Sequence, residues 1–128
     1  MERRVWVPCR GDSDLFVIDT LTNTVVGFNA NINLATGVAF TPNGSKAYVA
    51  EGTELSGIID VIDMTTFQIA NRIPVGNLPH VLAVTPSGRH LFVTNALSGT
   101  IMQIDTSTDK VLRTIQAGNH PLGITFIQ

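Results

Sequence analysis

The sequence predicts an all-β protein built from β-propeller blades, and three observations lead to this prediction. An apolar run ending in Ile-Asp occurs at Ile18-Asp19, Ile62-Asp63 and Ile104-Asp105, with separations of 44 and 42 residues. Each copy holds four short runs of strand-forming residues, and four strands in about 40–45 residues are typical of a propeller blade. No segment keeps an apolar period of 3.6 residues over three turns, so no helix is predicted.

The four strands of each repeat are expected to run from the ring centre to the rim. Inner strands are expected at 37–40, 81–84 and 123–126, and second strands at 5–7, 47–49 and 91–93. Third strands are expected at 15–19, 58–63 and 101–105, and rim strands at 24–28, 68–73 and 110–115. Two extra residues in the second copy are assigned to the loop 51–56, because loops absorb insertions without a register slip.

The turns between these strands repeat as well. Thr41–Gly44 and Thr85–Gly88 each read Thr-Pro-x-Gly, in which Pro presets one dihedral angle and Gly relieves the exit. Asp19, Asp63 and Asp105 each follow a third strand, where a carboxylate can accept backbone N–H bonds and hold the next turn. A structural role is therefore expected for these three aspartates.

Composition narrows the class of protein. The 128 residues are 44% hydrophobic and 14% charged, and this low charge suits strands buried on both faces. A net charge of −2 gives no indication of electrostatic attraction to nucleic acid or to anionic lipid. Apolar runs are too short for a membrane helix or a signal peptide, so no compartment is indicated. Cys9 is the only cysteine, which rules out an intrachain disulfide.

Several strings of this sequence resemble the YVTN-repeat family of β-propellers. They are Tyr48–Glu51, Phe92–Asn95, Pro74–His80 and Thr85–Gly88. The resemblance covers nearly the whole chain and is strongest in the second and third copies. It implies a propeller fold. It leaves function open, because such propellers serve as surface-layer, binding and redox-associated proteins, and similar repeats occur in lactonase-type enzymes.

The order of the strands raises the question of how a ring closes. We expect one module, 1–128, of three repeats at about 1–40, 41–84 and 85–128, with the last strand completing the first blade. Propellers close with about four to eight blades. A head-to-tail homodimer of six blades is therefore predicted, with 123–127 of each chain pairing with 4–7 of the other. A nine-bladed ring of three chains and a piece of a larger propeller are the alternatives.

Ligands of propellers usually bind at the mouth of the channel, on loops held by the rigid blades. His80 and His120 are expected there, in the loops 76–80 and 118–121 that lead into inner strands. Histidine suits metal ligation and proton transfer. A hydrogen bond from His80 to a neighbouring loop is the favoured interpretation, and no metal or cofactor is expected.

Charged residues are expected on the same face. Arg10, Asp12, Glu51 and Glu54 lie in the loops 9–14 and 51–56. Arg10 suits an anion, and Asp12-Ser13-Asp14 resembles part of a calcium loop without the rest of its pattern. The sequence contains no Ser-His-Asp order, nucleotide-binding glycine pattern, CxxC or His-Glu-x-x-His.

These observations predict a non-catalytic propeller module that presents its loop face to a protein or a small ligand. The alternative is a lactonase-like or metal-assisted hydrolase. Its site would lie around His80, His120, Glu51 and Glu54. A purely architectural part of a larger propeller is the third interpretation.

Overall fold

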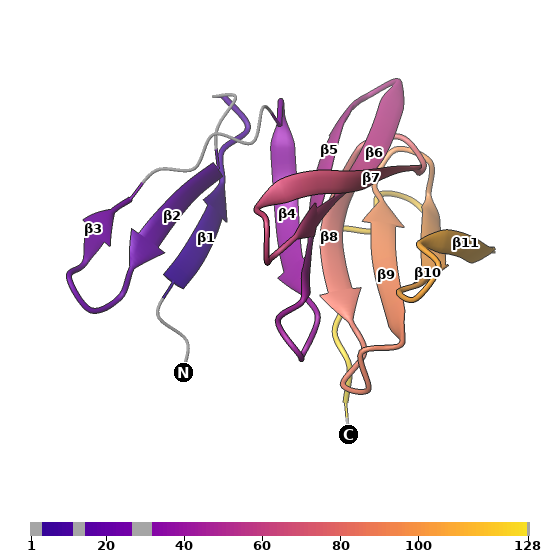
Figure 1. The fold of residues 1–128 in the computed structure, drawn as a ribbon. Helices are drawn as coiled ribbons and strands as arrows, with labels where there is room; N and C mark the ends of the chain where they lie inside the picture. The colour runs from indigo at the N-terminus through magenta and orange to yellow at the C-terminus, as the bar shows by residue number, and fades with distance from the viewer. Residues whose placement is uncertain (1–3, 12–14, 27–31, 128) are drawn as a thin grey trace.

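Three antiparallel sheets, one for each repeat, stand side by side (Figure 1). The computed structural model describes residues 4–11, 15–26 and 32–127. The first sheet contains β1 (Arg4–Pro8), β2 (Leu15–Asp19) and β3 (Thr24–Val25). The second contains β4 (Ala35–Phe40), β5 (Lys46–Thr53), β6 (Ser56–Asp63) and β7 (Gln68–Pro74). The third contains β8 (Pro79–Val84), β9 (His90–Asn95), β10 (Thr100–Asp105) and β11 (Lys110–Gln116).

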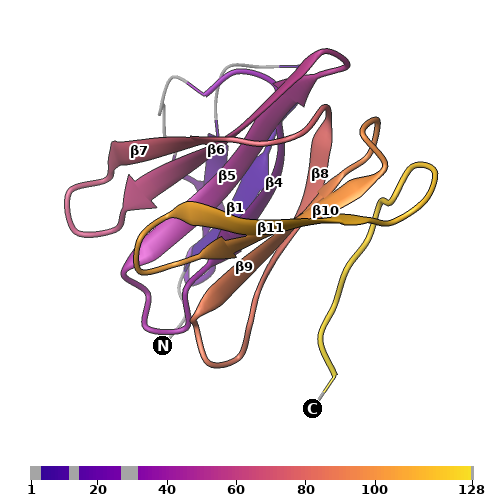
Figure 2. The same cartoon turned by 90° about the vertical axis from the view of Figure 1, so that its right-hand side faces the viewer.

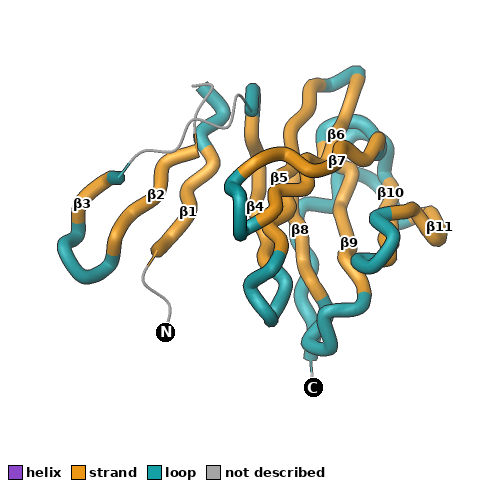
Figure 3. Tube along the Cα trace, in the orientation of Figure 1, coloured by secondary structure: helices purple, strands orange, loops and turns teal. Residues whose placement is uncertain are grey.

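This arrangement confirms the all-β fold and the blade order within the repeats. In the second and third sheets the strands follow one another from β4 to β7 and from β8 to β11. Figure 3 shows strands and loops only in the described part of the chain. No helix there is long and apolar enough to cross a membrane.

Among the described residues the first sheet has three strands and no inner strand. The segment 123–126, expected to form that strand, has no strand pairing in the single chain. Figure 1 and Figure 2 show this C-terminal segment near the third sheet and away from β1. A strand exists only where a neighbour accepts its hydrogen bonds, and β1 is out of reach within one chain.

The hairpin between β5 and β6 corrects the expected loop at 51–56. Cross-strand pairing continues from Lys46 opposite Asp63 to Thr53 opposite Ser56. β5 and β6 each have eight residues, against six in β9 and in β10, so the two extra residues are taken up in paired strands and not in a longer loop. A hairpin can absorb such an insertion without a register slip, because both strands grow together.

The predicted tight turns are present. Gly44 and Gly88 adopt φ angles of 72° and 76°, a left-handed conformation that glycine enters without steric cost. Their N–H groups donate to the carbonyl oxygens of Thr41 and Thr85 at 2.9 and 2.8 Å. These turns fix the register between each inner strand and its neighbour.

The three repeated aspartates hold the turns after the third strands, as predicted. Asp19, Asp63 and Asp105 each accept a backbone N–H bond two residues ahead at 2.7–2.8 Å. Asp105 also accepts a bond from the Ser107 hydroxyl, and this bond lowers the pKa of Asp105 below its usual value. The role of these residues is structural.

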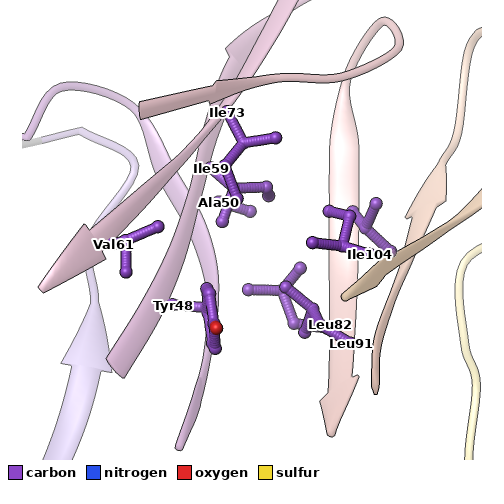
Figure 4. Close-up of a cluster of buried hydrophobic side chains, with 9 residues drawn as sticks. Tyr48, Ala50, Ile59, Val61, Ile73, Leu82, Leu91 and Ile104 are labelled. Atoms are coloured by element: carbon purple, nitrogen blue, oxygen red, sulfur yellow. The ribbon is translucent and has the colours of Figure 1, made fainter. Parts of the chain in front are cut away.

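The apolar core lies between the sheets and not within any one of them. One cluster joins the second and third sheets (Figure 4): Tyr48, Ala50, Ile59, Val61, Ile73, Leu82, Leu91, Val93 and Ile104. The other joins the first and second sheets: Trp6, Leu15, Val17, Ile32, Ala35, Ala47, Val49 and Ile62. Strands β5 and β6 contribute to both clusters, so the second sheet is buried on both faces, which explains the low content of charge.

Candidate functional site

The loop face is the side of the sheets formed by residues 9–11, 53–56, 75–78, 96–99 and 117–121. On it, two of the residues singled out in the sequence, Arg10 and His80, border one cavity of about 380 Å³. Pro8, Ala35, Thr36 and Leu78 complete its lining. His80 is the second residue of β8 and does not lie in a loop as expected, because pairing of that strand already begins at Pro79.

The polar groups of this cavity are unequally paired. The Arg10 side chain is exposed and its Nη1 donates a long bond of 3.4 Å to the Gly52 carbonyl oxygen. The Thr36 hydroxyl donates to the Pro79 carbonyl oxygen at 2.6 Å. His80 Nδ1 is buried and has no hydrogen-bond partner among the described residues. Buried polar atoms are nearly always paired, so this nitrogen is a candidate contact for a ligand.

Close packing of two inner strands brings the cavity lining together. Strands β4 and β8 contact each other directly across the interface of the second and third sheets. Gly37 permits this approach, since a Cβ atom there would lie 2.7 Å from the His80 carbonyl oxygen. Thr36 and His80 are therefore held at a fixed separation by the backbone.

Glycines also hold the neighbouring loop in place. The Val75 N–H donates to the Gly57 carbonyl oxygen at 3.0 Å, and a Cβ atom on Gly57 would overlap the Gly76 carbonyl oxygen. The Leu78 N–H donates to the Thr53 carbonyl oxygen at 2.9 Å. The β5–β6 hairpin thus anchors the segment that supplies Leu78 to the cavity.

His120 lies apart from His80. It is exposed and borders a separate cavity of about 240 Å³, which Ala96–Gly99, Gln116, Gly118 and Asn119 help to form. Its φ angle of 50° matches the 50° of Leu78 and the 57° of Leu34. His120 is therefore the counterpart of Leu78 in the repeat, and the structure does not bring the two histidines into one site.

The predicted carboxylates do not join the cavity either. Glu51 lies in β5, where its Oε2 accepts the Asn33 N–H at 3.0 Å, and Glu54 is exposed at the tip of the β5–β6 hairpin. Asp12 lies outside the described residues. Within 4–11, 15–26 and 32–127, no group of three or more His, Cys, Asp or Glu residues could hold a metal ion.

One buried carboxylate was missed as a candidate. Asp60 on β6 is 0% exposed, and burial, with a smaller contribution from the charge of Glu51, raises its pKa to about 6. Arg72 Nε lies 3.0 Å from Asp60 Oδ1, but neither oxygen receives a well-aligned hydrogen bond from the described residues. Apolar neighbours on both sides in the sequence, Ile59 and Val61, were the available signal.

Comparison with protein families gives one match that spans most of the chain. The model of a family described as YNCE-like beta-propeller matches residues 15–127. Antigen Lp49 of Leptospira interrogans is 27% identical over an alignment that covers 65% of this chain and 23% of that protein. The uncharacterized protein YncE of Salmonella typhimurium is 28% identical, with 79% of this chain and 28% of that protein covered. The chain spans about a quarter of the length of these two relatives.

Solved structures share the arrangement of sheets. Kuenenia stuttgartiensis hydrazine synthase superposes with a TM-score of 0.82 at 23% identity, over 93% of this chain and 34% of that one. The dihydro-heme d1 dehydrogenase NirN in complex with DHE gives a TM-score of 0.68 at 21% identity, over 92% and 26%. At these identities the likeness concerns the fold alone.

Proposed function

The chain belongs to the YNCE-like beta-propeller family, and on this premise we propose that it is a non-catalytic binding module for a small acidic ligand. The cavity of Arg10 and His80 on the loop face is the proposed binding site. The unpaired, buried Nδ1 of His80 beside an exposed guanidinium is the observation that carries the proposal.

The chemistry of the cavity favours an acidic group of small size. A guanidinium binds a carboxylate through two parallel N–H bonds, and a neighbouring imidazole adds a further donor or acceptor. Apolar contacts from Pro8, Ala35 and Leu78 surround these polar groups. A few convergent polar groups within an apolar lining are typical of small-molecule sites.

We expect malonate to bind at this cavity. Because the chain has three histidines, the NMR signal of the His80 ring can be assigned with a His80→Gln variant and followed during titration. Malonate should shift the His80 signal saturably, whereas malonamide, which has the same shape and no charge, should not. Arg10→Gln should weaken malonate binding about tenfold, the loss of one charge-assisted bond.

The matched control is Arg113→Gln, which removes an exposed arginine on β11. It should leave the titration unchanged. An equal response to malonate and malonamide, or equal malonate binding by Arg10→Gln and the unchanged chain, would contradict the proposed site.

We further propose that two copies of the chain complete a six-bladed ring. The first sheet lacks an inner strand, while residues 123–126 lie unpaired beside the third sheet. Phe126 meets Phe92 edge-on with 5.5 Å between ring centroids. Phe40 meets Trp6 in the same manner at 5.2 Å, and these residues hold the same places at the interface of the first and second sheets. The segment therefore follows the path of an inner strand without a sheet of its own.

The mass in solution tests this assembly. Sedimentation equilibrium of the 128-residue chain should give twice 13.8 kDa. Ile124→Asp should shift the mass to that of the monomer, since Leu82, its counterpart in β8, is 8% exposed and belongs to the core. Leu55→Asp is the matched control, because Leu55 is 87% exposed at a hairpin tip, and it should remain dimeric.

A mass of 13.8 kDa for the unchanged chain would overturn the dimer, and three times that value would favour the nine-bladed ring. The malonate titration separates assembly from binding. The Arg10 cavity is lined by residues of one chain. If the chain were a monomer and still bound malonate, the proposed ring would be wrong and the proposed binding site would stand.

A further inference from the structure

The interface between the second and third sheets is fastened by a polar contact that we call the latch, formed by Lys46, Tyr48 and Asp109. Lys46 Nζ lies 3.2 Å from each Asp109 carboxylate oxygen and donates to the Thr106 carbonyl oxygen at 2.6 Å. The buried Tyr48 hydroxyl donates to Asp109 Oδ1 at 2.9 Å. Burial and this bond to the carboxylate raise the pKa of Tyr48, so its phenol stays protonated.

The interface between the first and second sheets has the cation of the latch but not its carboxylate. Arg4 takes the place of the latch lysine, because each lies opposite, in the strand register, the aspartate that ends the next strand. Trp6 takes the place of the latch tyrosine by the same register. Phe67 takes the place of the latch aspartate, with the same φ angle of 57° and the same 2.7 Å bond back to the turn aspartate.

A cavity of about 370 Å³ opens where the missing carboxylate would be expected. Arg4, Trp6, Phe40, Thr41, Pro42, Gly44, Met64 and Phe67 line it. It lies among the tight turns, on the side of the sheets opposite the loop face. Among the described residues, Arg4 forms no ion pair.

We propose that this cavity binds a small aromatic carboxylate. The carboxylate pairs with the Arg4 guanidinium, as Asp109 pairs with Lys46 in the latch. The ring of the ligand packs against Trp6, Phe40 and Phe67, because aromatic rings prefer offset or edge contacts with one another. Arginine at this position suits a free carboxylate better than lysine, because its planar fork binds both oxygens. This site is distinct from the Arg10 cavity and does not depend on it.

Phenylacetate is the probe, and Trp6 reports its binding. Trp6 is the only tryptophan, so the tryptophan fluorescence of the chain, excited selectively over that of Tyr48, comes from this cavity. Phenylacetate should change the fluorescence saturably, and phenylacetamide, which lacks the charge, should bind about tenfold more weakly. Arg4→Gln should abolish the difference between the two probes. Arg113→Gln, on β11, should preserve it.

A pair of substitutions at Phe67 tests the relation to the latch. Phe67→Asp should supply the missing carboxylate to Arg4 and weaken phenylacetate binding about tenfold or more. Phe67→Asn changes the size and polarity of the side chain as Phe67→Asp does, but adds no charge. It should keep the preference for phenylacetate over phenylacetamide. Both residues tolerate a left-handed φ angle better than phenylalanine, so both variants should fold.

Three results would overturn the proposal. Equal fluorescence changes with phenylacetate and phenylacetamide would show that no charge is recognised. An unchanged preference in Arg4→Gln would exclude Arg4 as its source. If Phe67→Asp bound phenylacetate as tightly as the unchanged chain, the ligand carboxylate would not occupy the place that Asp109 has in the latch.

Discussion

Gly57→Ala is expected to lower the free energy of unfolding by about 3 kcal/mol or more, at the upper end of the usual cost of overpacking. An added Cβ would overlap the Gly76 carbonyl oxygen and lie 2.7 Å from Pro79 Cδ, so backbone must move. The β5–β6 hairpin would then separate from the segment that carries Leu78 into the Arg10 cavity. Urea unfolding followed by far-ultraviolet circular dichroism measures the change.

Gly11→Ala is the matched control. Nothing among the described residues lies within 4 Å of a Cβ atom at this position, so the free energy of unfolding should change by no more than about 0.5 kcal/mol. If Gly57→Ala had an equally small effect, the close approach of the hairpin and the 75–78 segment would not limit this fold.

A rise in pH from about 4 to about 7 is expected to destabilise the folded chain through Asp60. In the unfolded chain an aspartate has a pKa near 3.9, whereas the buried Asp60 has a pKa of about 6. The folded state therefore binds the proton more tightly. Its advantage is complete below about pH 4 and is lost as the pH rises through 6, a change of about 3 kcal/mol at most.

Asp60→Asn isolates this contribution. The variant cannot ionise, so its free energy of unfolding should vary less over the same pH range, and above pH 7 it should exceed that of the unchanged chain. Arg72 is the partner left behind, but its side chain is 53% exposed and remains solvated. A pH profile that is identical in the two proteins would assign the titration to other groups.

The repeat pattern predicts the parts of the fold that depend on local sequence. The turn residues Asp63 and Gly44 act as expected, because each serves its own neighbours in the chain. The third strands begin and end close to the expected residues for the same reason. Blade order follows from the recurrence of these signals, and it needs no knowledge of contacts between repeats.

Features that depend on a partner strand could not be predicted in this way. The extra residues near Glu51 form paired strands, and His80 lies in β8, because pairing across the sheet sets where a strand begins. The segment 123–126 lacks pairing because none of the described strands of the chain lies alongside it in register. The apposition of Arg10 and His80 depends on how sheets pack, since one follows the first strand and the other belongs to the third sheet.

The unlike ends of the row of sheets give the molecule a direction. One end offers β1 as an edge without an inner strand, and the other offers 123–126 as a segment without a pairing partner among the described residues. In the proposed assembly such ends join head to tail, and each added copy again leaves one end of each kind free. The addition of copies would then stop only when the segment 123–126 of the last copy reaches β1 of the first. In the assembly proposed above, the twist between neighbouring sheets, and not the strength of any single junction, would determine whether copies close into a ring or continue as a filament.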